Sequence, residues 1–239
     1  MRKEIIHLQN VKKYYYIGEN IIKALDGIDI EVNRGDFVAI MGPSGSGKST
    51  SMNMIGSLDT PTSGHVFLDG EDISKLSESK LSQLRGKKIG FIFQQFNLIP
   101  NLTAIENVAL PLLFQGVEES NRLEQAKKLL TMIEMADRIN HYPNQLSGGQ
   151  QQRVAIARSL ANEPEVILAD EPTGNLDTKT GEIVMNFLDE MHTKKRTIIM
   201  VTHDPDLAME HANKIYWIID GKVQKITQKQ NNKWIKAKS

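Results

Sequence analysis

Four short, nearly continuous apolar runs constrain the fold of this chain more than any other sequence feature. They span residues 37–41, 89–93, 166–169 and 197–201. Strands covered by helices on both faces contain such runs, whereas half-exposed strands alternate apolar and polar residues. Helical patterns follow at residues 47–57, 178–192 and 205–211, the last with Asp204 as its expected N-cap. This alternation predicts an α/β domain with a largely parallel sheet.

A different pattern fills the middle of the chain. From residue 95 to residue 162 the sequence has helix-length patterns and no convincing strand. These patterns span residues 103–114, 118–135 and 149–160. Near the N-terminus, residues 5–11 and 28–32 alternate as strands of a small antiparallel sheet do. We therefore predict a single domain, with an α/β core at 1–94 and 163–226 and an inserted helical subdomain at 95–162.

The C-terminal tail, residues 227–239, is rich in lysine. After Asp220 and Gly221, a predicted hairpin turn, the chain holds six lysines and no acid. A solvated end is the more frequent explanation of such a charge run. Contact with acidic lipid headgroups near a membrane partner is the alternative, and both stay open at this point.

Charge and composition exclude several classes of protein. Lys and Arg together number 29, as do Asp and Glu, so the formal net charge is +0 and no basic excess favours a nucleic-acid partner. The absence of cysteine excludes disulfides and thiolate metal sites and suits a reducing cytoplasm. No stretch approaches the roughly 18 apolar residues that span a bilayer. We expect the chain to be soluble by itself and to act at a membrane only through a partner.

A glycine-rich segment after the first apolar run matches the phosphate-loop pattern G-x-x-x-x-G-K-[ST]. Its residues are Gly42, Pro43, Ser44, Gly45, Ser46, Gly47, Lys48, Ser49 and Thr50. The glycines let successive N–H groups point at phosphate oxygens, and the following helix adds its positive end. Lys48 is expected at the β- and γ-phosphates, Ser49 at Mg²⁺ and Thr50 at the α-phosphate. A flexible loop beside an ordinary helix is the alternative, but chance gives this match in only about one such chain per hundred.

Two acids, Asp170 and Glu171, directly follow the apolar run at 166–169. Ligands in open α/β sheets bind outside the carboxyl ends of strands, so Asp170 is placed to hold Mg²⁺ directly or through water. Because side chains alternate along extended backbone, Glu171 is expected to point elsewhere and to polarise an attacking water. A helix cap or solvated turn is the alternative, weakened by the phosphate loop. His203 ends another buried run, where a structural role competes with a contact to the γ-phosphate.

A second glycine-rich turn precedes a helical pattern, and a helix N-terminus of this kind is another anion site. Its residues are Leu146, Ser147, Gly148, Gly149 and Gln150. This string resembles the signature motif of the ATP-binding-cassette (ABC) ATPases without a mismatch, and the resemblance covers almost the whole chain. In that family two cassettes pair head to tail, and the signature of one closes on the nucleotide held by the other.

The resemblance assigns roles to further residues. Gln94 matches the glutamine that contacts Mg²⁺ and the attacking water, and it opens the segment that meets the membrane partner. Asp177 lies in the loop that crosses the dimer interface, and His203 matches the switch histidine at the γ-phosphate. Adenine in that family stacks on an upstream aromatic, and among the tyrosines at 14–16 the register selects Tyr15.

The resemblance also implies a fold and a set of ligands. The expected fold is a P-loop NTPase (RecA-like) α/β core with a mostly parallel sheet, an N-terminal antiparallel β subdomain and an inserted helical subdomain. ATP and Mg²⁺ are the expected ligands. The implied catalytic residues are Lys48, Gln94, Glu171 and His203, and the implied metal ligands are Ser49, Gln94 and Asp170. Expected partners are a second copy of the chain and a transmembrane permease on the inner face of the cell membrane, with no nucleic acid.

Two further segments, residues 93–100 and 142–145, resemble the macrolide-export and lipoprotein-release group of the family. Its members pair with permeases of few transmembrane helices and often act by mechanical transmission. Export or extrusion of a peptide, antibiotic or lipoprotein is therefore the expected work. An ABC ATPase that drives a membrane signalling or cell-division partner without transport is the alternative. A soluble ABC ATPase of DNA repair or translation is a third, disfavoured by the single cassette and the neutral charge.

Overall fold

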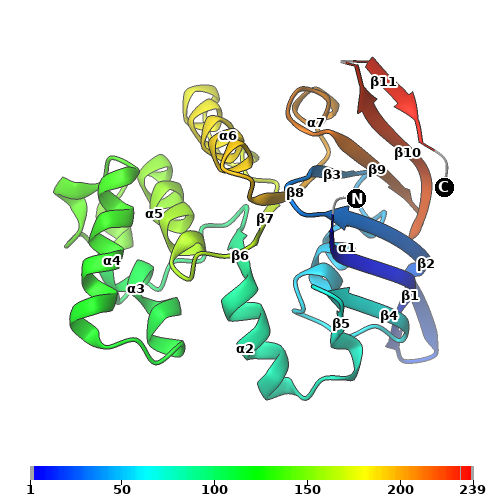
Figure 1. The fold of residues 1–239 in the computed structure, drawn as a ribbon, viewed down its shortest axis with the longest axis horizontal. Coiled ribbons are helices and arrows are strands. Elements are labelled where there is room, and N and C mark those ends of the chain that lie inside the picture. Colours follow the sequence, from blue (N-terminus) through cyan, green and yellow to red (C-terminus); the bar gives the residue numbers. More distant parts are fainter. Residues whose placement is uncertain (1–2, 232, 238–239) are drawn as a thin grey trace. The chain divides into compact units, whose positions relative to one another are not determined.

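The computed structural model describes residues 3–231 and 233–237. The chain divides into two compact units, one made of Met1–Ser82 with Asp189–Ser239 and the other of Gln83–Leu188. Each unit combines strands with helices (Figure 1). The helical subdomain predicted at 95–162 lies inside the second unit, and its boundaries as a separate body stay a prediction.

An antiparallel sheet forms one part of the first unit, with strand order β2-β1-β4-β5. Its strands are β1 (Glu4–Ile17), β2 (Asn20–Asn33), β4 (Ser63–Leu68) and β5 (Glu71–Asp72). Ile6 of β1 pairs with Val32 on one side and with Leu68 on the other, and all three side chains are buried. The two strands predicted near the N-terminus are confirmed, and both extend further than their alternating segments.

The phosphate-loop strand lies in the second sheet of this unit. The strands that this unit contributes to the sheet are β3 (Phe37–Met41), β8 (Thr197–Thr202), β9 (Lys214–Ile219), β10 (Lys222–Gln230) and β11 (Lys233–Lys236). β3 pairs in parallel with β8 on one side and β9 on the other. Every residue of β3 and β8 is buried, as the continuous apolar runs predict.

Short helices complete the first unit. They are α1 (Lys48–Ile55), α7 (Pro205–His211) and the 3-10 helix η1 (Ile73–Lys75). The carboxylate of Asp204 accepts hydrogen bonds from the N–H groups of Asp206 and Leu207, at 2.8 and 3.2 Å. The predicted N-cap of α7 is therefore confirmed, with proline at the first helical position.

A turn at Asp220 and Gly221 joins β9 to β10, as predicted. Both residues have positive φ, 48° and 70°, as the type I′ turn of a tight hairpin requires. β10 then pairs with β11, where Lys229 lies opposite Trp234. Most of the lysine-rich tail is thus a β-hairpin, which the sequence did not predict because lysines interrupt its short apolar positions.

The second unit holds two parallel strands and most of the helices. Its strands are β6 (Ile89–Ile92) and β7 (Val166–Asp170), and its helices are α3 (Ala104–Phe114), α4 (Glu119–Met132), α5 (Gly148–Leu160), η2 (Ala136–Arg138) and η3 (Pro143–Gln145). The predicted helices at its centre are confirmed. The predicted end of α4 is three residues too late, because the chain turns at Glu134 with φ of 59°.

Two helices cross the boundaries between the units, α2 (Glu78–Lys88) and α6 (Thr178–Thr193). The sequence predicted α6 but not α2. Only Leu81 of α2 is buried, so this helix lacks the apolar repeat on which a sequence-based prediction depends.

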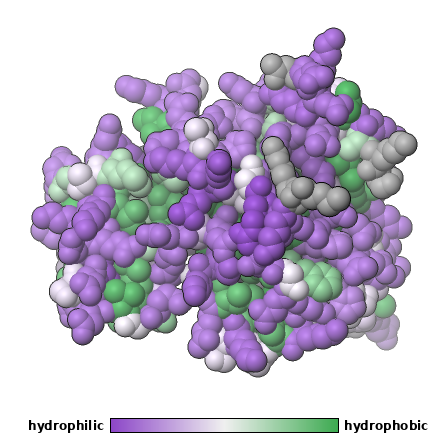
Figure 2. All heavy atoms as spheres, in the orientation of Figure 1, coloured by the Kyte–Doolittle hydropathy of each residue, from purple (hydrophilic) through white to green (hydrophobic). Residues whose placement is uncertain are grey.

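The face seen in Figure 2 is mostly hydrophilic, with hydrophobic residues in separate small areas. Within residues 3–231 and 233–237, no helix has both the length and the apolar character that a membrane crossing requires.

Candidate functional site

The phosphate loop lies in the first unit, between the buried strand β3 and helix α1. Gly45 and Gly47 have φ of 76° and 104°, in the region that side chains rarely adopt. A Cβ atom at Gly47 would lie 2.4 Å from the carbonyl oxygen of Ala24. The Ser46 carbonyl accepts a 2.9 Å hydrogen bond from the N–H of Gly221, in the β9–β10 turn. Segments from both ends of the chain therefore hold the loop in shape.

Lys48 and the start of α1 have the features that a polyphosphate requires. The Lys48 ammonium donates hydrogen bonds to the carbonyl oxygens of Gly42 and Pro43, at 2.8 and 2.9 Å. Gly47 occupies the N-cap position, no side chain in the described part of the chain caps the helix, and its first turn contains no acid. The buried Ser46 hydroxyl has no hydrogen-bond partner among the described residues. The positive end of this helix is therefore open to an anion, while Pro43, Ser44, Gly45 and Ser49 are exposed.

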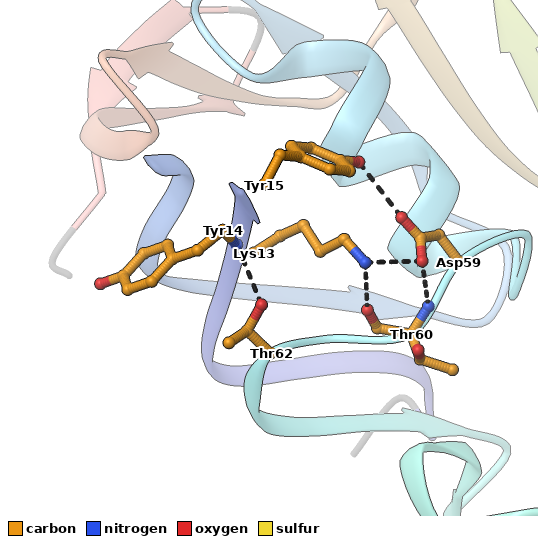
Figure 3. A network of polar contacts seen from close by, with 6 residues as sticks. All are labelled: Lys13, Tyr14, Tyr15, Asp59, Thr60 and Thr62. Atoms are coloured by element: carbon orange, nitrogen blue, oxygen red, sulfur yellow. Dashed lines mark hydrogen bonds and ion pairs between the residues drawn. The ribbon is translucent and has the colours of Figure 1, made fainter. Parts of the chain in front are cut away.

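Only one of the three consecutive tyrosines points toward this helix. The Tyr15 hydroxyl donates to the carboxylate of Asp59, just after α1, at 3.1 Å (Figure 3). Tyr14 instead donates to Asp26 at 2.5 Å, and Tyr16 is 66% exposed. Extended backbone thus separates neighbouring side chains here, and Tyr15 is the tyrosine on the phosphate-loop side.

His203 lies at the same sheet edge as the phosphate loop. β3 and β8 run parallel, and their last residues, Met41 and Thr202, are paired. Gly42 follows the first strand and the exposed His203 follows the second. The structure therefore brings together the phosphate loop and the histidine that the sequence placed near the γ-phosphate.

Asp170 and Gln94 lie at one sheet edge of the second unit. β6 and β7 run parallel with Ile92 opposite Ala169, so Asp170, the last residue of β7, and Gln94, shortly after β6, lie at the carboxyl ends of paired strands. The backbone carbonyl of Gln94 accepts a 3.1 Å hydrogen bond from the Asn175 side chain. The metal-binding residues proposed by the resemblance are thus placed in both units, because Ser49 belongs to the first.

Glu171 does not have the extended conformation that the sequence predicts for it. Glu171 was expected to continue the extended strand, with its side chain alternating relative to Asp170. The strand instead ends at Asp170, and Glu171 has φ of 44°, in the left-handed region. Its carboxylate is therefore directed by a backbone turn and not by the strand pleat. For a glutamate this conformation is uncommon and costs free energy.

The signature turn starts α5 with a complete capping box. The Ser147 hydroxyl accepts a 3.3 Å hydrogen bond from the Gln150 N–H, and the Gln150 side chain accepts a 2.9 Å hydrogen bond from the Ser147 N–H. A Cβ atom at Gly149 would lie 2.8 Å from the Thr180 methyl carbon, whereas at Gly148 it would meet only Phe96 at 3.7 Å. The fold of this unit therefore requires glycine at 149 but not at 148.

Asp177 has a structural task at the start of α6. Its carboxylate accepts hydrogen bonds from the Thr180 hydroxyl at 2.7 Å and from the Thr180 N–H at 3.1 Å. These hydrogen bonds hold the pKa of the Asp177 carboxyl below its ordinary value. Since the same Thr180 packs against Gly149, it connects the loop that carries Asp177 to the signature turn.

Three polar residues have structural roles that the sequence did not predict. Asp59 contacts Tyr15 across 44 residues of sequence. The guanidinium of Arg158, in α5, donates to the carbonyl oxygens of Phe96 and Asn97, and burial lowers its pKa. Thr180 is the third, through its contact with Gly149. All three act through contacts between distant segments, so no local motif points to them.

Comparison with known proteins gives one consistent result. The profile of the ABC transporter family matches residues 25–174. An uncharacterized ABC transporter ATP-binding protein of Thermotoga maritima is 48% identical over 227 residues, covering 95% of this chain and 97% of the relative. The macrolide export ATP-binding/permease protein MacB of Aggregatibacter actinomycetemcomitans is 52% identical over 229 residues, but this chain spans only 35% of its length.

Solved structures agree with this result. A Methanocaldococcus jannaschii ATP-binding cassette, solved as a dimer in a post-hydrolysis state bound to ADP and Pi, has a TM-score of 0.88 and 48% identity over 95% of this chain and 100% of that one. A Clostridium perfringens cassette described as part of an ABC transporter complex has a TM-score of 0.81 and 28% identity over 94% of this chain and 88% of that one. The predicted α/β fold class is confirmed by these neighbours.

Proposed function

This chain belongs to the ABC transporter family, and from that premise we propose which of its residues bind and hydrolyse ATP and what the hydrolysis drives. As a member it is an ATP-binding, ATP-hydrolysing subunit that works with a membrane permease. The observation that carries the residue assignment is the uncapped start of α1 beside the Lys48 ammonium.

The nucleotide lies on the first unit. The N–H groups of the phosphate loop and the Lys48 ammonium bind the β- and γ-phosphates, and Thr50 reaches the α-phosphate. His203, at the neighbouring strand end, contacts the γ-phosphate. Tyr15 stacks on the adenine, which its position on the α1 side supports. When the Lys48 ammonium gives up its hydrogen bonds to the carbonyl oxygens of Gly42 and Pro43, its positive charge is free to bind the phosphates.

Mg²⁺ fits the oxygen donors that this chain offers. Ser49, Asp170 and Gln94 provide a hydroxyl, a carboxylate and an amide oxygen, and the ion prefers such ligands. When bound, Mg²⁺ supplies positive charge to the β- and γ-phosphate oxygens. Glu171 orients and polarises the attacking water, and Gln94 helps to position it. Phosphoryl transfer requires mostly this positioning and charge neutralisation.

The signature residues act on the nucleotide of a second copy. Ser147, Gly148, Gly149 and Gln150 form the contact, with Asp177 at the interface between copies. A Cβ atom at Gly148 would fit without a clash, so the chain's own fold does not require a glycine there, and this supports the assignment. The dimeric form of the Methanocaldococcus jannaschii cassette is consistent with it.

The hydrolysis drives a transmembrane permease. We place the subunit in the cytoplasm, on the inner face of the cell membrane, held there by that permease. Macrolide export in the name of the MacB relatives supports export or extrusion of an antibiotic, peptide or lipoprotein, including by mechanical transmission. Copurification from native membranes tests this proposal. Recovery with an integral membrane protein supports it, and recovery only with ribosomes or DNA contradicts it.

The decisive experiment on the site uses Glu171→Gln. We expect ATPase activity to fall at least about 100-fold, because a general base contributes that much. Blocked hydrolysis should trap the closed dimer, so Mg-ATP should double the mass of the 26.9 kDa chain in solution. Mass by light scattering with and without Mg-ATP measures this change.

Two further variants serve as controls for the trapped dimer. Adding Ser147→Arg to Glu171→Gln should abolish the dimer while ATP binding persists, because the bulky cation blocks contact between copies. Adding Lys48→Ala should abolish ATP binding itself. A Glu171→Gln protein that hydrolyses ATP at the normal rate would show that Glu171 does not polarise the water.

A further inference from the structure

Tyr15 lies in a network of polar contacts that joins β1 to the segment after α1 (Figure 3). Its hydroxyl donates to one oxygen of the Asp59 carboxylate at 3.1 Å. The ammonium of Lys13 donates to the other oxygen at 2.7 Å and to the carbonyl oxygen of Thr60 at 2.9 Å. Asp59 also accepts from the N–H of Thr60 at 2.7 Å. The Asp59 carboxylate therefore accepts hydrogen bonds from three donors, the Tyr15 hydroxyl, the Lys13 ammonium and the Thr60 N–H.

The network fixes the direction of the tyrosine ring as well as its hydroxyl. The Lys13 ammonium lies over the ring, 5.1 Å from its centre, so one face of the ring meets a cation of the same chain. A flat ligand can then stack only on the opposite face. Because the Tyr15 hydroxyl donates to Asp59, the ring is tied to the segment that directly follows α1.

We infer that Asp59, paired with Lys13, is a positioning residue that holds the Tyr15 ring at a fixed place relative to the phosphate loop, ready for the nucleotide base. This inference rests on the proposed stacking of adenine on Tyr15. A free tyrosine side chain loses rotamer freedom when it stacks on a base. A ring already held by its hydroxyl has given up that freedom on folding, so less is lost on binding.

The protonation states support these contacts at neutral pH. Burial raises the pKa of Asp59, but hydrogen bonds from Lys13, Thr60 and Tyr15 outweigh burial and leave the pKa below its ordinary value. Burial and the hydrogen bond to Asp59 raise the pKa of Tyr15. The carboxylate is therefore an acceptor and the phenol a donor, as the network requires.

The test compares a ligand that has a base with one that has none. Calorimetric titration would measure the affinity of the purified chain for ADP and for inorganic tripolyphosphate. Asp59→Ala should weaken ADP binding about tenfold, the size expected from losing a hydrogen bond to a charged group, and leave tripolyphosphate binding unchanged. Tyr15→Phe should weaken ADP binding in the same direction, since it keeps the ring and removes only the hydroxyl.

Two control variants separate positioning from general damage. Asp69→Ala removes a carboxylate of the same unit that pairs with Lys3 and Arg34, and it should leave the affinity for both ligands unchanged. Tyr15→Ala removes the ring and should weaken ADP binding more than Tyr15→Phe does. If Tyr15→Ala binds ADP normally, the stacking proposal itself is wrong.

Two results would overturn the positioning role alone. In the first, Tyr15→Ala weakens ADP binding but Asp59→Ala and Tyr15→Phe bind ADP like the unaltered chain, so the ring acts without its hydroxyl contact. In the second, Asp59→Ala weakens ADP and tripolyphosphate equally, so the carboxylate supports the phosphate loop as a whole. If Asp59→Ala fails to fold, the ADP affinity of Tyr15→Phe still tests the positioning role.

Discussion

The phosphate loop before α1 and the signature turn before α5 look alike in sequence and differ in structure. Both are glycine-rich turns with serine that lead into a helix. The phosphate loop reaches its helix through glycines with positive φ and leaves the helix without a side-chain cap. The signature turn ends in Ser147, which closes a capping box with Gln150. The first helix start is open to a ligand, and the second is already satisfied by its own chain.

A glycine at a helix start can be required by the chain's own fold, or it can be present for another reason. At Gly47 the glycine is required by backbone conformation and by the nearby Ala24 carbonyl. At Gly148 neither reason applies, so the reason for glycine lies outside the chain's own fold. A sequence pattern alone therefore does not identify an anion site. The anion site predicted at the signature turn stays a prediction, and its ligand must compete with the Ser147 cap for the Gln150 N–H.

The largest expected effect tests the strained glycines of the phosphate loop. Gly47→Ala should lower the free energy of unfolding by about 3 kcal/mol, since it adds left-handed strain to a clash with a backbone carbonyl. Gly45→Ala is the matched control, with positive φ but no atom within 4 Å of the added Cβ, and should cost about 1 kcal/mol. Urea denaturation of the nucleotide-free chain measures both. Equal costs would show that strain alone requires these glycines.

A second pair of substitutions tests the two signature glycines. Gly149→Ala should be less stable than Gly148→Ala by about 1–2 kcal/mol, because only its Cβ collides with Thr180. In the Glu171→Gln background, Gly148→Ala should fold normally yet weaken the ATP-dependent dimer. Thermal denaturation and light scattering measure these two properties. A Gly148→Ala chain that is unstable by itself would mean that its glycine serves the chain's own fold.

The serines of the two turns give a smaller contrast. Ser147→Ala removes the cap of α5 and should cost about 1 kcal/mol of stability. Ser46→Ala removes a buried hydroxyl without a hydrogen-bond partner among the described residues, so the nucleotide-free chain should be about as stable as before. The denaturant midpoints of Ser147→Ala and Ser46→Ala, each compared with the midpoint of the unaltered chain, measure the two changes in stability. The contrast between open and capped helix starts fails if both serines cost the same.

The smallest effect concerns a third helix start, that of α6, where the cap is charged. Hydrogen bonds from Thr180 lower the pKa of Asp177, so this cap contributes fully above the unfolded-state pKa of about 3.9 and is lost as pH falls through the lower folded-state pKa. The Ser147 cap does not titrate. Carboxyl NMR titration should place the Asp177 midpoint below its ordinary value, and Thr180→Val should raise it. A midpoint that Thr180→Val does not move would rule out this cause.

The sequence predicted those features that depend on neighbouring residues. Lys48 and Gly47 sit in a local motif, and the buried strands on either side of it are continuous apolar runs. The left-handed conformation of Glu171 was not predictable, because a glutamate after a strand ordinarily has a negative φ. Helix α2 has a single buried residue and therefore no apolar period.

Contacts between distant segments could not be predicted from the sequence for a related reason. The partner of Tyr15 is 44 residues away, and a carboxylate at Asp59 looks like any other surface acid in one sequence. Thr180 gains its role only because α6 packs its first turn on Gly149. The local chemistry of the candidate site was therefore visible in the sequence, and the residues that hold that chemistry in place were not.

The support of the phosphate loop sets an order for the synthesis of the protein. The loop leaves the ribosome early, yet its strand β3 pairs with β8 and β9, and its Ser46 carbonyl is bound by Gly221. These partners all follow β7 in the sequence, so they are translated long after the loop. A nascent chain therefore carries the nucleotide motif long before it can hold that motif in shape, and the support of the loop is complete only after Gly221 has been translated.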